Sequence, residues 1–135
     1  MGREGFTIIE IMTVVIIIAI LATLAVPPLI KTMDAAKGRL AKTNLKLILA
    51  AEKVYRNEVG AYMPITGGRV GAEHEWFKKY LGLDLKETDF EYEVDTSGDP
   101  VNRFTAVALP KKKYQETGII SINQDGTLSG NYPPQ

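Results

Sequence analysis

The chain has 135 residues, of which 45% are hydrophobic, and its 16 basic side chains balance its 16 acidic ones. This balance excludes the strongly basic surface that extended nucleic-acid contacts usually require, and the length allows one small domain beside a membrane segment. The absence of cysteine and the presence of a single histidine, His74, exclude disulfides, thiolate metal sites and a histidine cluster.

The first predicted element is an apolar helix that begins at Phe6 and runs to Val26. About 20 helical residues, each rising about 1.5 Å, cover roughly 30 Å, the thickness of a bilayer's hydrocarbon core. A secretory signal would be shorter and would close on a small-residue cleavage site. The one charged side chain in the run, Glu10, costs a few kcal/mol or more in hydrocarbon unless it has a partner. The segment can span a membrane, and Glu10 indicates a further task.

The heptapeptide GFTIIEI, which begins at Gly5 and precedes the long apolar run, resembles the processing motif of type IV prepilins and type II secretion pseudopilins. The resemblance implies that a dedicated membrane peptidase cuts between Gly5 and Phe6 and methylates the new amine of Phe6. It also implies that Glu10 guides the register of subunits in a filament. A methylated amine keeps its charge, so the amine of Phe6 can pair with Glu10, one helical turn away.

Pro27 and Pro28 follow the apolar run, and a break or bend of the helix is expected there because two successive amide donors are missing. The basic residues that follow the segment outnumber those that precede it. The positive-inside rule alone would therefore place the carboxyl side in the cytoplasm. The resemblance implies the reverse, with the leader, residues 1–5, in the cytoplasm, and we follow it because the motif is more specific than a count of charges.

Residues 29–59 are expected to continue the helix, because apolar side chains recur at spacings of three, four and seven. The members of this stripe are Met33, Ala36, Leu40, Leu47, Ala51 and Val54. We expect it to pack as the core of a small domain. A helix from Phe6 to Val59 would be roughly 80 Å long if unbroken, which is too long for the remaining residues to bury. Its exposed apolar half requires lipid or further copies of the chain, which indicates polymerisation.

The rest of the chain is expected to form a loop region at 60–88, with a short helix at 73–81, and a sheet at 89–130. Trp76 is expected to dock onto the sheet as core. Strands are predicted at 90–95, 103–109, 119–123 and 127–129. The expected fold class is α+β: a long N-terminal helix packed on a three- or four-stranded antiparallel sheet, as in pilins. The expected parts are the leader, a transmembrane and filament-core helix at 6–28, and a globular domain at 29–135.

One loop has the spacing of calcium ligands, at Asp95, Ser97 and Asp99, but it lacks the distal glutamate of a full calcium loop, so a polar turn is preferred. His74 lies between two glutamates, and one imidazole among solvated carboxylates is a weak metal site. The sequence contains no nucleophile elbow, phosphate loop or metalloprotease motif. We therefore predict a protein that is not an enzyme and that needs no cofactor or metal.

The leading interpretation is a subunit of a type IV pilus or pilus-like filament. It would wait as a single-pass protein in a bacterial inner membrane, surrounded by lipid, and polymerise with itself into a surface or periplasmic filament. The resemblance implies the prepilin peptidase and an assembly machinery as further partners. A secretion pseudopilin is the rival, and attachment, motility, secretion and DNA uptake all stay open. A membrane-tethered module that binds DNA or a surface ligand is the alternative from another class. Its sequence feature is the basic patch Lys111, Lys112 and Lys113, for which a solvated hairpin tip is preferred.

Overall fold

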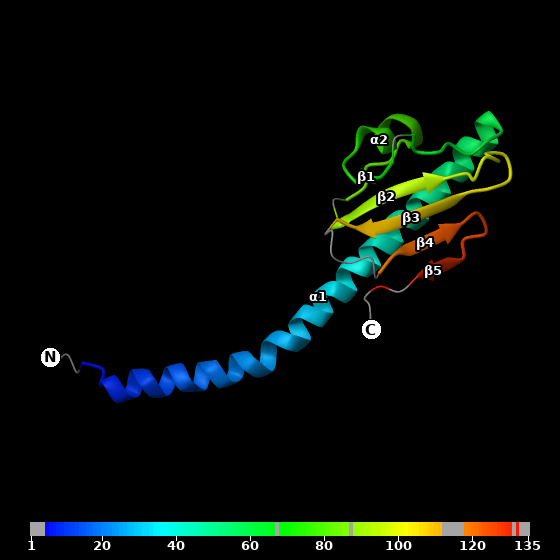
Figure 1. Ribbon diagram of the computed structural model, residues 1–135. Helices are drawn as coiled ribbons and strands as arrows, with labels where there is room; N and C mark the ends of the chain where they lie inside the picture. Colours follow the sequence, from blue (N-terminus) through cyan, green and yellow to red (C-terminus); the bar gives the residue numbers. More distant parts are fainter. Residues whose placement is uncertain (1–4, 67, 87, 112–117, 131, 133–135) are drawn as a thin grey trace. The chain divides into compact units, whose positions relative to one another are not determined.

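The computed structural model describes residues 5–66, 68–86, 88–111, 118–130 and 132. The chain separates into two compact units, one that ends at Asp34 and one that begins at Ala35. Figure 1 shows the elements in chain order. They are helix α1 (Ile8–Val59), strand β1 (Val70–Gly71), helix α2 (Glu75–Leu81) and strands β2 (Phe90–Asp95), β3 (Thr105–Pro110), β4 (Ile120–Asn123) and β5 (Leu128–Gly130). The predicted α+β class, a long helix with a small antiparallel sheet, is confirmed.

The first unit is the apolar part of α1. The helix continues through Pro27 and Pro28, so the expected break is wrong, and a bend at these residues stays a prediction. Proline's fixed φ fits a helix, and the cost is the loss of two donors, which leaves the carbonyls of Thr23 and Leu24 without their helical partners. The apolar side chains of this unit are exposed. By length and composition, α1 is able to cross a membrane.

The second unit contains a five-stranded sheet in the order β1-β2-β3-β4-β5, with every neighbouring pair antiparallel. In the register, Tyr92 lies opposite Ala108, and Ala106 lies opposite Ile122. The four predicted strands are confirmed within one or two residues, but the predicted number of strands is wrong. The extra strand, β1, lies in the region predicted as a loop, and its Val70 pairs with Tyr92 of β2. A strand of two residues is too short to show an alternating pattern, so the sequence gives no signal for it.

The core lies between the sheet and one face of α1, and it includes Ala41, Leu45, Ile48 and Leu49 of the helix. These residues do not belong to the apolar stripe that the sequence predicted as core. That prediction is wrong for three of the stripe's side chains, because Met33 is 52%, Leu47 44% and Val54 58% exposed. The helix carries two apolar stripes, and periodicity identifies the helix without saying which stripe the sheet will cover.

Helix α2 closes one side of this core. Trp76 is buried in the core, which confirms the prediction that it is a core residue, and its ring lies edge-on to that of Phe77, with 5.3 Å between the ring centroids. The helix begins at Glu75, because the ring nitrogen Nδ1 of His74 accepts a hydrogen bond from the amide of Trp76 at 3.2 Å. Gly82, in the left-handed conformation with φ of 63°, ends it. The only histidine of the chain is thus a helix cap.

Candidate functional site

The first turn of α1 holds Glu10 through a reciprocal capping box with Thr7. The backbone N–H of Thr7 donates to Glu10 Oε2 at 2.8 Å, and the Thr7 hydroxyl donates to the same oxygen at 2.9 Å. In return, the N–H of Glu10 lies 3.3 Å from Thr7 Oγ1. This arrangement satisfies orphan donors at the helix start. Our sequence reasoning missed Thr7 as a positioning residue, although the Thr-x-x-Glu pattern before an apolar run is a signal for it.

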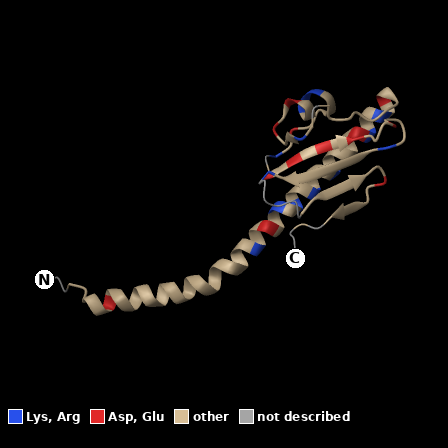
Figure 2. Cartoon of the chain, in the orientation of Figure 1, with Lys and Arg blue, Asp and Glu red and all other residues tan. Residues whose placement is uncertain are grey.

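The surroundings of Glu10 are apolar and open. Glu10 is the first charged side chain of α1, and the next one along the helix is Lys31. Figure 2 shows most of this part of α1 in the colour of uncharged residues. A shallow groove of about 340 Å³ lies beside the carboxylate and is lined by Phe6, Ile9 and Val14 among others. Within residues 5–30 Glu10 has no ion-pair partner. The Glu10 carboxylate is thus held in place by hydrogen bonds, while its charge has no ion-pair partner among these residues.

The backbone just before α1 is accessible. Gly5 and Phe6 precede the first helical residue, Ile8, and Phe6 is 82% exposed. Apart from its neighbours in the chain, no atom of the described residues lies within 4 Å of the place where a Cβ of residue 5 would stand. A protease must reach the bond that it cuts, and the bond between Gly5 and Phe6 lies in an exposed segment outside the helix. Residues 1–4 of the predicted leader lie outside the described residues.

The candidate calcium ligands Asp95, Ser97 and Asp99 each bond within a single turn. The Asp95 carboxylate accepts from the amide of Ser97 at 2.9 Å and from its hydroxyl at 3.0 Å, and these bonds lower the pKa of Asp95. Asp99 accepts from the amide of Asn102 at 3.2 Å. Among the described residues, no group of three or more His, Asp or Glu side chains could hold a metal ion. The geometry is that of a polar turn.

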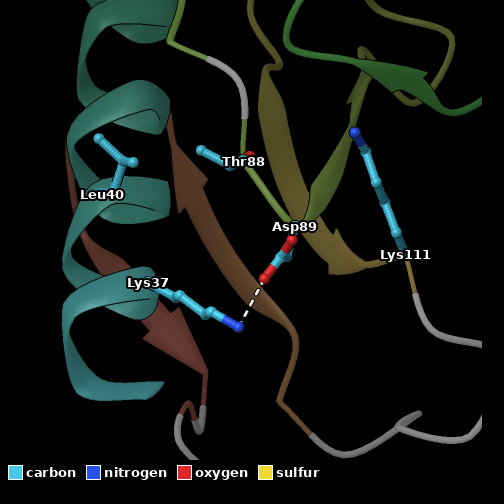
Figure 3. A pocket seen from close by; sticks show the side chains of 5 residues that line it. All are labelled: Lys37, Leu40, Thr88, Asp89 and Lys111. Atoms are coloured by element: carbon cyan, nitrogen blue, oxygen red, sulfur yellow. Dashed lines mark ion pairs between the residues drawn. The ribbon is translucent and has the colours of Figure 1, made fainter. Parts of the chain in front are cut away.

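Of the candidate basic patch, Lys112 and Lys113 lie outside the described residues. Lys111 Nζ lies 3.7 Å from Glu73 Oε1, and its backbone N–H donates to the Asp89 carbonyl at 2.8 Å. Figure 3 shows the adjoining pocket of about 350 Å³, where Lys37 Nζ lies 2.7 Å from Asp89 Oδ2. Each of these lysines faces a carboxylate, so this corner presents paired charges to solvent.

Two buried polar positions on α1 were not found from the sequence. Glu52 is fully buried, and its Oε2 accepts from the amide of Met63 at 2.9 Å, while Oε1 has no partner within the described chain. Burial raises the pKa of Glu52 to about 7, partly opposed by the Met63 hydrogen bond. The Asn44 amide donates to Tyr92 Oη at 3.0 Å and to the Lys86 carbonyl at 3.1 Å. Their signal, a polar residue within the buried stripe, becomes visible only when the buried stripe is known.

Comparison with known proteins places this geometry in a family, although no family model matches the chain. The chain is 43% identical over 134 residues to the type IV major pilin protein PilA of Myxococcus xanthus, across 98% of this chain and 60% of that protein. It is 47% identical over 60 residues to the type II secretion system core protein G of Pseudomonas aeruginosa, across 44% of this chain and 42% of that protein. It therefore spans less than two thirds of the length of either relative. These identities, with the long apolar helix and small antiparallel sheet, show that the chain belongs to the type IV pilin and type II secretion pseudopilin family.

Proposed function

We propose that the protein is the structural subunit of a type IV pilus or a closely related filament, and not an enzyme. The observation that carries the proposal is the 43% identity to a major pilin over nearly the whole chain. The exposed apolar part of α1 supports it, because an uncovered helix of this length requires lipid or other copies of itself. The subunit waits in the inner membrane and acts in a filament outside it.

Processing creates the charge that assembly uses. Cleavage between Gly5 and Phe6 by a prepilin peptidase leaves an amine one helical turn from Glu10, and methylation keeps that amine positive. Lipid tails are as apolar as leucine, so moving the helix from bilayer to filament gains little hydrophobic energy. An unpaired carboxylate in hydrocarbon costs a few kcal/mol. Pairing Glu10 with an amine removes that cost. A pair formed within one chain exists in the bilayer as well, so it is the pairing of Glu10 with the amine of a neighbouring chain that favours the assembled state and sets its register.

The test is mass spectrometry of the mature protein and of sheared filaments. We expect a chain that begins at a methylated Phe6, with the chain itself as the main component of the filaments. A Gly5→Val variant should keep residues 1–5, stay in the membrane fraction and yield no filaments. Wild-type filaments made of chains with an uncut amino terminus would contradict the proposal. Single cysteines at Lys46 and Asp99, labelled from outside intact cells, would check that the second unit lies outside the cytoplasm.

A secretion pseudopilin is the second candidate, and the 47% identity to a secretion core protein over 60 residues favours it. The two functions share the processing and the helix, so they differ only in what the filament serves. Deletion of the gene separates them. Loss of surface filaments with an unchanged set of secreted proteins indicates a pilin, whereas loss of secreted proteins with intact surface pili indicates a pseudopilin.

A further inference from the structure

The charges of the chain are unevenly distributed, although they balance overall. Residues 31–46, which directly follow the apolar segment, carry five basic side chains and one acidic one. Residues 47–135 carry ten basic and 13 acidic side chains. The part of the chain next to the apolar segment is therefore positive, and the remainder is negative. Since we propose that the second unit lies outside the cytoplasm, the positive-inside rule does not explain this positive excess.

Three of these basic residues, Arg39, Lys42 and Lys46, lie along one side of α1, and we call them the basic flank. Their spacings of three and four residues place them within an arc of about 60° around the helix. Arg39 and Lys46 are exposed, and Lys42 is half-buried. None of the three forms an ion pair within the described chain. Figure 2 shows basic residues along this part of α1. The basic flank therefore offers positive charge to a partner outside the chain.

The basic flank begins close to the point where α1 can leave a bilayer. Ile30 is the last residue of the uncharged segment, and Arg39 follows it by nine helical residues, or about 13 Å. The headgroup layer extends about 5–7 Å beyond the hydrocarbon core, and charges interact across about 8 Å more at physiological ionic strength. Arg39 is therefore within reach of the headgroups when the helix stands upright, and a lean of the helix brings Lys42 and Lys46 closer.

A membrane surface fits the basic flank better than a nucleic acid does. Each basic side chain close to an anionic membrane surface strengthens binding roughly fivefold. The acidic excess of residues 47–135 repels a long polyanion, which would contact much of the second unit. The same acidic excess is repelled by anionic lipid, so the two parts of the charge together turn the basic flank toward the membrane.

We propose that, before assembly, the basic flank binds the anionic phosphodiester headgroups of the bilayer leaflet on the carboxyl side of the apolar segment. This inference rests on the proposed waiting state in the inner membrane and names its lipid partner. The contact adds an electrostatic hold on the waiting subunit, and the hold must be broken when the subunit enters a filament. Salt weakens this contact, because it screens charges that lie outside the hydrocarbon core.

The experiment measures which lipids the full chain retains. The chain is reconstituted in nanodiscs of equimolar phosphatidylglycerol and phosphatidylcholine, transferred to mild detergent and analysed for bound lipid by mass spectrometry. We expect wild type to retain phosphatidylglycerol over phosphatidylcholine by at least about fivefold. The flank variant, with Arg39→Gln, Lys42→Gln and Lys46→Gln together, should lower this ratio at least about threefold. High salt during the transfer should lower the wild-type ratio toward that of the flank variant.

The matched control carries Lys78→Gln, Lys79→Gln and Arg103→Gln, which remove the same charge from exposed positions elsewhere in the second unit. Its lipid ratio should stay within about twofold of wild type, and both variants should unfold at the wild-type urea concentration. Equal lipid ratios for the flank variant and the control would overturn the inference. Loss of filaments from the flank variant with an unchanged lipid ratio would also overturn it, because the flank would then serve a contact between chains. Failure of the wild-type chain to insert into the nanodiscs would instead refute the proposed membrane state.

Discussion

The buried carboxylate of Glu52 should make the stability of the second unit depend on pH. Its pKa is raised from an ordinary value of 4.5 to about 7, chiefly because no part of the side chain is exposed to water. In the unfolded chain Glu52 releases its proton near pH 4.5, whereas in the folded chain it holds it to about pH 7. The stabilisation is fully present below pH 4.5, decreases as pH rises to about 7 and is absent above that.

The size of the effect follows from the difference between the two pKa values. One pKa unit corresponds to about 1.4 kcal/mol, so a rise from 4.5 to about 7 corresponds to about 3 kcal/mol of unfolding free energy. Small domains are stable by about 5–15 kcal/mol, so a loss of this size is a large fraction of the total. The amide of Met63 continues to donate to Oε2 of the ionised Glu52 at high pH, whereas Oε1 has no hydrogen-bond partner among the described residues.

Urea unfolding of the full chain in a mild detergent, followed by the fluorescence of Trp76, measures this dependence. Trp76 is the single tryptophan and is buried in the second unit. Glu52→Gln keeps the acceptor for Met63 and removes the titration, so the variant should be more stable than wild type by about 3 kcal/mol at pH 8 and within about 1 kcal/mol at pH 4.5. Glu58→Gln, an exposed control on the same helix, should follow wild type. Parallel pH profiles for wild type and Glu52→Gln would refute the reasoning.

Three further changes test other contacts. Glu10→Gln keeps an acceptor for the helix cap but removes the charge. We expect normal cleavage and a filament yield reduced at least about tenfold, which is equivalent to about 1.4 kcal/mol. An unchanged filament yield in shearing assays would contradict the assembly role of Glu10. Asn44→Leu removes the donor to Tyr92 Oη and should lower the unfolding free energy, measured from urea midpoints, by about 1–3 kcal/mol. An unchanged midpoint would show that the Asn44–Tyr92 hydrogen bond does not contribute to stability. Gly130 has a φ of 120°, and a Cβ at this position would collide with the carbonyl of Ile119. Gly130→Ala should therefore lower the unfolding free energy by about 1–3 kcal/mol. Full hydrogen-exchange protection of β5 in the variant would contradict this prediction.

The sequence predicted those features that depend on a short stretch of chain. The apolar helix, the strand at Phe90–Asp95 and the expected role of Glu10 rest on local hydropathy, alternation or a contiguous motif. The buried stripe of α1 depends instead on which face the sheet meets. When a helix carries two apolar stripes, both have the helical period, and the sequence does not say which one the sheet covers. The prediction places Leu47 in the core, whereas the structure buries Leu45.

The buried polar positions follow the same rule. Glu52 is one of several acidic residues in a charged, amphipathic helix, and nothing in its neighbours distinguishes it from an exposed glutamate such as Glu58. Its burial results from contact with the chain after α1, where Met63 donates to it. Thr7 is the contrary case, because its capping pattern with Glu10 is local and visible in the sequence.

The strand order also determines how the second unit can fold. Every pairing in the sheet joins strands that are neighbours in the chain, and the longest connection, between β1 and β2, contains helix α2, so we expect the sheet to form by closing local connections. Contacts between α1 and the sheet, such as that between Asn44 and Tyr92, join residues 48 positions apart and require a much longer loop. We therefore expect the meander to form early and the helix to dock on it later. Such an order suits a chain whose amino-terminal segment is held in a membrane while the remainder folds, because the first steps do not depend on where that segment lies.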